Sequence, residues 1–235
     1  FKQALKANIQ KIILIVGEKT EQPFKEKFGT TYQGIPIFYA RQTYDLKERD
    51  KPWGTVDALL AATPFLTEPF IVCNGDDIYG SQTFITLAKH LREHGGKMSA
   101  TVGYPILAVL PDQGTANRGI LELAKEQKVS KITEVLSIEK NNLGVTGRSP
   151  QDICSMNIFA LYPETLKLLD MRLKEFKEKY RGNRTAECLL PTEFSTLVQT
   201  GKMSMQAYTA EEQWYGITNQ GDEVVIQEAL KDKHL

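Results

Sequence analysis

Short apolar runs alternate with amphipathic segments through the first 105 residues of the chain. Residues 20–29, 54–66 and 81–96 carry apolar side chains at helical spacing and have Gly or Pro at their ends. The run at residues 69–74 has no polar alternation, which indicates a strand that is buried on both faces. This rhythm predicts a mainly parallel sheet with helices on both sides. The runs typical of strands are "KIILIVG", "GIPIFYARQ", "PFIVCN" and "KMSATVGYP".

The second half of the chain continues this pattern less regularly. Residues 118–138 are typical of two strands around a charged turn, and residues 153–163 are typical of one long strand. Helical spacing follows at residues 163–180 and 189–202, before a closing strand and a final amphipathic helix at residues 222–233. We therefore predict an α/β fold, with a three-layer α/β/α Rossmann-like arrangement around a mixed, mainly parallel sheet.

The length and the composition bound the class of protein. A chain of 235 residues can form one large domain with a sizeable core, and no repeat or linker divides it, so we expect a single domain over residues 1–235. The net charge is +0 and no apolar run approaches the roughly 18 residues of a membrane span, so neither a nucleic acid nor a membrane is an expected partner. Cys73, Cys154 and Cys188 are widely spaced in apolar contexts, which favours reduced core thiols in a cytoplasmic protein.

Two adjacent carboxylates follow the buried run, in the stretch "FIVCNGDDIYG". Ligands of open α/β sheets bind outside the carboxyl ends of the strands, and Asp76 and Asp77 come directly after such an end. Carboxylate oxygens are ligands that Mg²⁺ prefers, and Mg²⁺ usually accompanies phosphates. Asn-Gly-Asp is also good turn chemistry on its own, so the spacing leaves a metal site and a plain turn open.

The segment "KPWGTVDALLAA" places Gly54 and Thr55 at the start of a predicted helix. Free backbone N–H groups at such a start suit an anionic or nucleotide ligand, although ordinary helix capping is the simpler explanation of this pair taken alone.

Three further patterns favour structural roles. His90 and His94 have the i, i+4 spacing of a metal pair, but they lie in a charged helix without a third ligand, so we expect a solvated face. Trp214 and Tyr215 could stack on a base, although burial of such an aromatic pair near a strand end is commoner. No Ser-His-Asp or Cys-His spacing indicates an enzyme nucleophile.

Five stretches of the chain, in order, together resemble the sugar-phosphate nucleotidyltransferase (nucleoside-diphosphate-sugar pyrophosphorylase) family. The most specific is "KPWGTVDALLAATPFLTEPFIVCNGDDIYG", which resembles the family's Gly-Thr-Ala-x-Ala-Leu helix and the strand ending in Gly-Asp. The resemblance implies a fold of the nucleotide-diphospho-sugar transferase type. The other stretches, each weak alone, are "NRGILEL" with "VSKITEV", "ICSMNIFALYPE", "AECLLPTEFSTLVQTGKMSMQAY" and "WYGITNQGDEVVIQEA".

The resemblance implies an enzyme that joins a nucleoside triphosphate to a sugar-1-phosphate and releases pyrophosphate. A sugar-phosphate oxygen attacks the α-phosphorus in line with the help of Mg²⁺, and this nucleophile is already anionic, so no protein base is needed. Residues 1–105 would form a nucleotide-binding half and residues 106–235 a sugar-binding half. The implied site residues are Asp76 (catalytic, metal and nucleotide), Gln42, Gly54 and Thr55 (nucleotide), and Gly119, Glu134, Asn157 and Glu187 (sugar).

The sequence departs from the family at its start and in the sugar-side strand. The family has an N-terminal Gly-rich loop that cradles the triphosphate, whereas this sequence begins about where the helix after that loop runs. We expect an upstream segment of roughly 30–45 residues to carry the loop. Glu134 is followed by Val135 where the family usually has Lys, and Glu139 with Lys140 offers an alternative alignment.

The closing segment departs at the second metal ligand. Gly216 stands where many members carry Asp, and Thr218 stands where others carry a metal-binding Asn. Asn219 and Asp222 are nearby substitutes, and we take Asp222 as the candidate that joins Asp76 at the metal.

Two other functions stay open beside the sugar-1-phosphate reaction. One is a catalytically inactive pyrophosphorylase-like binding or regulatory module, which the missing loop and the altered closing segment favour. The other is a phosphocholine-type cytidylyltransferase. The sequence names neither the base nor the sugar, and it is compatible with a homo-oligomer.

Overall fold

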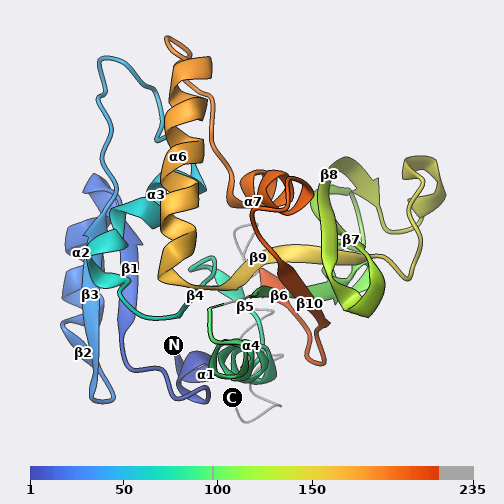
Figure 1. Cartoon of the computed structure of the whole chain (residues 1–235), viewed down its shortest axis with the longest axis horizontal. Helices are drawn as coiled ribbons and strands as arrows, with labels where there is room; N and C mark the ends of the chain where they lie inside the picture. The colour runs from blue at the N-terminus through green and yellow to red at the C-terminus, as the bar shows by residue number, and fades with distance from the viewer. Residues whose placement is uncertain (97, 217–235) are drawn as a thin grey trace. The chain divides into compact units, whose positions relative to one another are not determined.

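The computed structural model describes residues 1–96 and 98–216, and its ribbon is shown in Figure 1. The chain forms two compact units. Among the described residues, unit 2 comprises Asn8–Phe70 and Leu161–Glu193, and unit 1 comprises Phe1–Ala7, residues 71–160 and residues 194–216. The division into a nucleotide half and a sugar half at residue 105, within one domain, stays a prediction.

Unit 2 is built on a three-stranded sheet in the order β1-β3-β2. β1 pairs with β3 in parallel and β2 pairs with β3 antiparallel. The helices bury apolar residues at helical spacing: Val56 and Leu59 of α3, and Leu166, Leu169 and Leu173 of α6. The elements are β1 (Ile12–Val16), α2 (Glu18–Phe28), β2 (Thr31–Tyr32), β3 (Ile35–Arg41), α3 (Thr55–Ala61), the 3₁₀ turn η1 (Thr63–Phe65) and α6 (Pro163–Lys179).

Unit 1 is built on a sheet in the order β10-β6-β9-β7-β8, with β4 on β9. β6 and β10 run parallel, whereas β6–β9, β7–β9 and the long β7–β8 hairpin of Figure 1 are antiparallel. The mixed α/β fold is confirmed, with more antiparallel pairing in unit 1 than the strand–helix rhythm predicted, because consecutive strands there join by a hairpin. The strands are β4 (Phe70–Val72), β6 (Ser99–Pro105), β7 (Thr115–Leu123), β8 (Val129–Glu139), β9 (Ile153–Leu161) and β10 (Met205–Thr209).

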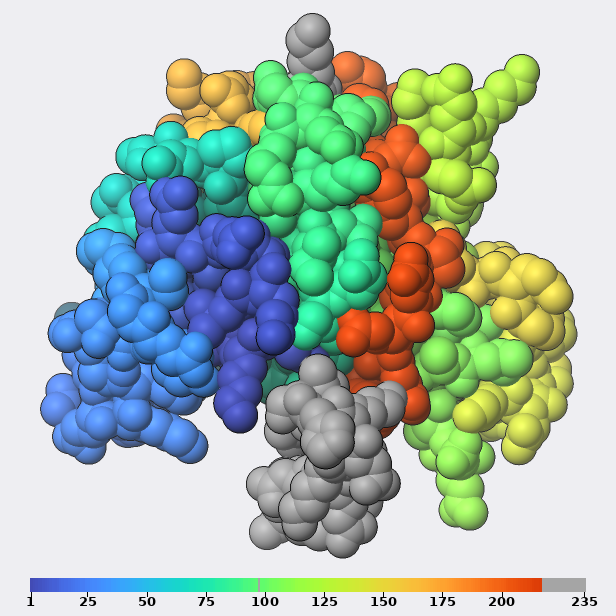
Figure 2. All heavy atoms as spheres, turned by 90° about the horizontal axis from the view of Figure 1, so that it is seen from below, coloured from blue at the N-terminus to red at the C-terminus, as the bar shows by residue number. Residues whose placement is uncertain are grey.

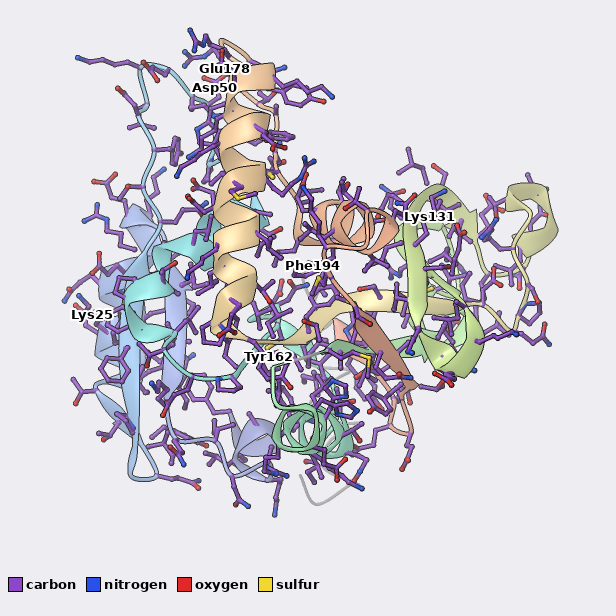
Figure 3. The ribbon with its side chains drawn as sticks, viewed as in Figure 1. Lys25, Asp50, Lys131, Tyr162, Glu178 and Phe194 are labelled. Carbon is purple, nitrogen blue, oxygen red and sulfur yellow. The ribbon has the colours of Figure 1, made fainter. Side chains whose placement is uncertain are left out.

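The remaining elements of unit 1 surround this sheet. Phe159 of β9 and Phe194 of α7 meet edge to face with ring centroids 4.7 Å apart in the core. Figure 3 labels Phe194. Among the described residues, no helix has both the length and the apolar character to cross a membrane. The elements are α1 (Lys2–Leu5), β5 (Asp77–Ile78), α4 (Ser81–His94), α5 (Ile106–Val109), η2 (Lys125–Gln127), η3 (Leu143–Thr146), β11 (Tyr215–Gly216) and α7 (Leu190–Gln199), which the chain enters from unit 2.

The three cysteines are free thiols. Cys154 and Cys188 are buried as predicted, but Cys73 is exposed, so the prediction of a core thiol is wrong for this residue. The reason is that β4 ends at Val72 and Cys73 already belongs to the following loop.

The expectation of a solvated histidine face on α4 is wrong for His90. The outer side of α4 lies at the surface of unit 1 (Figure 2), where Lys89 and Arg92 are exposed, but His90 is only 1% exposed. Met98 O, 2.7 Å from His90 Nε2, can only accept, so Nε2 carries the proton and Nδ1 accepts from the Tyr208 hydroxyl at 2.9 Å. The neutral ring therefore has both of its nitrogens paired.

Protonation of His90 is expected to destabilise the folded protein. Burial lowers the pKa of His90 below its usual 6.5, and the stacked His94 ring, 4.0 Å away, adds to this, while the Met98 carbonyl and Glu93 oppose it. Between the lowered pKa of His90 in the folded protein and 6.5, the unfolded chain binds more protons at this residue than the folded protein does. The free energy of unfolding therefore falls as the pH falls through this window. Chemical denaturation from about pH 8 to about pH 5 measures this slope.

The matched variant is His90→Gln, whose amide can keep a donor and an acceptor but does not titrate. We expect this variant to be less stable than the wild type near neutral pH, and to lose the part of the acid slope that His90 contributes. An unchanged slope in the variant would assign the pH dependence to other groups.

Candidate active site

The loop after β4 holds the two predicted aspartates in different environments. Asp77 is half-buried, and its Oδ2 accepts from Asn74 Nδ2 at 2.9 Å and lies 3.0 Å from the Tyr79 hydroxyl. The Tyr79 hydroxyl is also 2.8 Å from Met156 O, which ties the loop to β9. Burial raises the pKa of Asp77, although the hydrogen bonds from Asn74 and Tyr79 favour its ionised form. The contacts of Asp77 with Asn74 and Tyr79 therefore stabilise the turn after β4.

Asp76 is left free to meet a ligand. Its side chain is exposed, and none of the hydrogen bonds within the described residues involves its carboxylate. This fits a magnesium ligand, because Mg²⁺ is commonly held by one or two carboxylates, with water and substrate phosphates completing its shell. The described residues contain no group of three acidic, His or Cys side chains that could hold a metal by themselves. Asp222, the other predicted metal ligand, and the predicted helix at residues 222–233 lie outside the described residues.

Gly119 and Glu134 lie side by side, as a direct pair between β7 and β8. A Cβ atom at Gly119 would lie 3.4 Å from Ile132 Cγ2, 3.7 Å from Glu134 Oε2 and 3.9 Å from Ser155 Cβ, so these side chains surround the glycine at ordinary contact distances. Partial burial raises the pKa of Glu134, and the charge of Arg118 opposes this shift. The sugar-binding role of the pair stays a prediction.

Asn157 has a strained backbone in the middle of β9. Its φ of 57° is in the left-handed region, and the β6–β9 register shifts between Thr101–Phe159 and Gly103–Ser155, on either side of it. Bulges and such left-handed residues concentrate at functional sites, where they redirect a side chain. This geometry supports the predicted role of Asn157 without assigning it a ligand.

Three of the four predicted nucleotide residues, Gln42, Gly54 and Thr55, lie together in unit 2, whereas Asp76 belongs to unit 1. Gln42 Nε2 donates to Asp57 Oδ2 at 2.9 Å and to Gly54 O at 3.2 Å, which fixes the orientation of its amide. Asp57 Oδ1 in turn accepts from Lys177 Nζ at 2.8 Å, so both oxygens of this carboxylate have a donor. The base-binding role of Gln42 stays a prediction. Asp57 has no motif of its own, so the sequence did not indicate its role.

Gly54 and Thr55 also have structural roles in unit 2. Gly54 has a φ of 97°, and a Cβ atom there would lie 2.6 Å from Cys188 O, so only glycine fits this approach of two backbone segments. Thr55 Oγ1 accepts from the N–H of Leu190 at 2.9 Å. Glu187 forms an ion pair with Lys51 beside the same segment. Unit 2 thus brings Gln42, Gly54, Thr55 and Glu187 to one region, whereas Asp76, Gly119, Glu134 and Asn157 belong to unit 1.

The short strand β11 lies next to the aspartate loop in unit 1. Gly216 pairs with Asp77 across β11 and β5, so the position where many relatives carry an acid faces this loop. The Trp214 ring covers Gly216, since a Cβ atom there would lie 2.3 Å from the ring. Trp214 and Tyr215 are half-buried, so the expected burial of this aromatic pair is only partial. The indole Nε1 is buried, and Trp214 acts as a hydrogen-bond donor toward Asp77.

The chain belongs to the nucleotidyl transferase family, whose model matches residues 1–217. Similar solved structures include a UDP-glucose pyrophosphorylase in complex with UDP-glucose (15% identity, TM-score 0.64, covering 99% of this chain and 84% of that one). An inositol-1-phosphate CTP transferase from T. maritima is similar at 14% identity and a TM-score of 0.62, covering 94% of this chain and 76% of that one.

A putative glucose-1-phosphate thymidylyltransferase from Bacillus anthracis, in complex with a sucrose, is similar at 15% identity and a TM-score of 0.61, covering 97% of this chain and 77% of that one. Sequence comparison with curated proteins finds no match. The resemblance to sugar-phosphate nucleotidyltransferases is confirmed, and family membership supports nucleotidyl transfer as the general activity.

Proposed function

We propose that this protein is a Mg²⁺-dependent enzyme that transfers a nucleotidyl group from a nucleoside triphosphate to a sugar-1-phosphate and releases pyrophosphate. The observation that carries the proposal is the difference between the two adjacent aspartates in the loop after β4. Asp77 is occupied by Asn74 and Tyr79, whereas the adjacent Asp76 presents an exposed carboxylate without a partner among the described residues.

The residues of this chain would position the two reactants. Asp76 would hold Mg²⁺, which neutralises charge on the α-phosphate and on the incoming sugar phosphate when it is bound. Glu134, which pairs with Gly119 across β7 and β8, has a carboxylate that can accept from sugar hydroxyls. The phosphate oxygen that attacks is already anionic, so the chain needs to orient and neutralise more than it needs to move a proton.

The fixed amide of Gln42 supports one class of base. Its Nε2 is committed to Asp57 and Gly54, so its free oxygen can only accept a hydrogen bond. Every base offers a donor on its pairing edge: uracil, thymine and guanine have a ring N–H there, and cytosine and adenine have an exocyclic amino group. A Gln42 oxygen that faces the ring nitrogen would favour the first group, and we propose a triphosphate of that group as the substrate.

A two-part screen of the full chain tests these proposals. Thermal shifts would be recorded with UTP, dTTP, GTP, CTP and ATP, with and without Mg²⁺, because a ligand that binds only the folded state raises its apparent stability. Pyrophosphate release would then be measured for each triphosphate with glucose 1-phosphate, galactose 1-phosphate, mannose 1-phosphate, inositol 1-phosphate and phosphocholine. We expect a Mg²⁺-dependent shift and pyrophosphate release with UTP, dTTP or GTP and a sugar-1-phosphate.

Two outcomes would overturn the proposal in different ways. A Mg²⁺-dependent shift without pyrophosphate release from any pair would indicate the inactive binding module. Release only with CTP and phosphocholine would indicate the cytidylyltransferase alternative and would remove the proposed role of the Gln42 oxygen.

A further inference from the structure

Arg118 lies directly opposite the position where this chain lacks the family's usual lysine. That position is Val135, and β7 and β8 pair Arg118 with Val135 next to the Gly119–Glu134 pair. Directly opposed residues of an antiparallel pair share one face of the sheet, with Cβ atoms roughly 4.5–5.5 Å apart. The cation missing from one strand is therefore matched by a cation on the neighbouring strand.

The hairpin has an irregularity at this point. The register shifts between Ala116 and Arg118, and Ser137 on the facing strand has a φ of 56°. The Ser137 N–H donates to Asn117 Oδ1 at 3.0 Å, which fixes the irregular turn of the strand. A bulge changes the direction in which the neighbouring side chains point, so the local backbone sets the orientation of Arg118.

The guanidinium of Arg118 has donors to spare. Its Nε and one N–H of Nη2 donate to Val109 O, with Nε at 3.0 Å, and one N–H of Nη1 donates to Asn117 O at 2.9 Å. Of its five N–H groups, one on each terminal nitrogen has no partner within the described residues. All of its acceptors are neutral backbone carbonyls, so the positive charge is fixed in place but not neutralised by direct contact.

The surroundings of Arg118 belong to the predicted site. Its guanidinium carbon is 5.6 Å from the centre of the Trp214 ring, which also covers Gly216 beside Asp77. Burial lowers the pKa of Arg118, and Asp77 and Glu134 act on it as nearby acidic groups. A partly buried cation with free donors is stabilised when an anion that accepts hydrogen bonds arrives.

We propose that Arg118 binds the phosphate of the sugar-1-phosphate and takes over the charge that lysine would supply at position 135. This inference rests on the proposed function, because it assigns a role within that reaction. The acceptor brings its phosphate to the face of the hairpin that Arg118 shares with Val135, and it has to approach a second anion, the triphosphate. A guanidinium fork on the sugar-side hairpin holds the acceptor phosphate by charge-assisted hydrogen bonds and lowers the repulsion between the two reactants.

The test uses a neutral variant and a double variant that places the positive side chain on the opposite strand. Arg118→Gln keeps an amide that can donate to the Val109 carbonyl but removes the charge. The double variant Arg118→Val with Val135→Lys moves the charge to the opposite strand. We expect Arg118→Gln to raise the KM for the best sugar-1-phosphate of the screen by about 10- to 100-fold, with little change in the KM for the triphosphate. The double variant is expected to recover most of this loss, whereas Arg118→Val alone is not.

Inorganic phosphate provides a readout that does not depend on the sugar. It should inhibit competitively against the acceptor, and its inhibition constant should rise in Arg118→Gln and fall again in the double variant. If the wild type is active and Arg118→Gln changes neither the acceptor KM nor the phosphate inhibition constant, the inference is wrong. Equal increases in both KM values without recovery in the double variant would show a structural role only. An inactive wild type would instead refute the proposed function.

Discussion

Replacing Asp76 by Asn is expected to lower the rate of nucleotidyl transfer by about 10³-fold or more, because a neutral amide holds Mg²⁺ poorly and the charge on the α-phosphate is then not neutralised. The free protein should keep its thermal stability, since the Asp76 side chain is exposed and has no hydrogen-bond partner within the described residues. The same variant should lose the Mg²⁺-dependent part of the thermal shift with the triphosphate that binds the wild type.

The measurement compares pyrophosphate release and thermal shifts for Asp76→Asn and Asp112→Asn. Asp112 makes a matched control because it is an exposed aspartate of unit 1 that pairs with Lys140, away from the aspartate loop. Asp112→Asn should keep both the activity and the Mg²⁺ dependence. If Asp76→Asn also keeps them, the metal ligand is another residue, and the main support for the proposed function is lost.

Much of the fold could be predicted from the sequence because the signals are local. The apolar run at 69–74, its Asn-Gly turn and the flanking helices predicted β4 and the loop after it. The paired strands around the "AKEQK" turn became β7 and β8, with Gly119 opposite Glu134. Periodicity and turn residues act over a few positions, so they can be read from one sequence.

His90 shows a local signal that was available but misread. The buried residues of α4 are Thr83, Phe84, Leu87 and His90, which follow the i, i+4, i+7 spacing of one helix face. The neighbouring charges drew attention to the opposite face. A periodicity count that includes polar residues would have placed His90 in the core.

The rest of the candidate site depends on contacts between distant parts of the chain. Gly54 is required by the approach of Cys188, and the orientation of Gln42 is fixed by Asp57, which Lys177 holds. Neither relation leaves a pattern in the sequence, because the partners are far apart and come together only in the folded unit. Arg118 was likewise invisible until the strand register placed it opposite Val135.

Replacing Arg49 by Met is expected to destabilise unit 2 by about 3 kcal/mol, because it removes a buried guanidinium and leaves four backbone carbonyl groups without their donor. Arg49 is only 2% exposed, and its guanidinium stacks 3.5 Å from the centre of the Trp53 ring. All of its hydrogen bonds go to backbone carbonyls, two within its own loop and two across to the 183–186 segment. These carbonyls are Lys51 O at 3.2 Å, Pro52 O at 3.3 Å, Ala186 O at 2.5 Å and Asn183 O.

Arg184→Met is the matched control in the same loop contact. Arg184 pairs with Asp50, which Figure 3 labels beside the end of α6, and both side chains are exposed. Exposed ion pairs contribute little, so this variant should be much less destabilised than Arg49→Met. Chemical denaturation measures the two losses. Equal losses of stability would show that the contact between the Arg49 loop and the 183–186 segment, called the Arg49 clip below, depends on the exposed ion pair and not on the buried guanidinium.

The Arg49 clip also has a consequence for ligand binding. It joins the loop before Gly54 to the segment before Cys188, and these two segments meet where Gly54 leaves room for only a backbone. Hydrogen–deuterium exchange should therefore rise at residues 183–190 in Arg49→Met, because the segment loses its anchor. If unit 2 carries the nucleotide contacts, the KM for the triphosphate should rise more than the KM for the sugar-1-phosphate. The reverse order would move the nucleotide site away from Gln42 and Gly54.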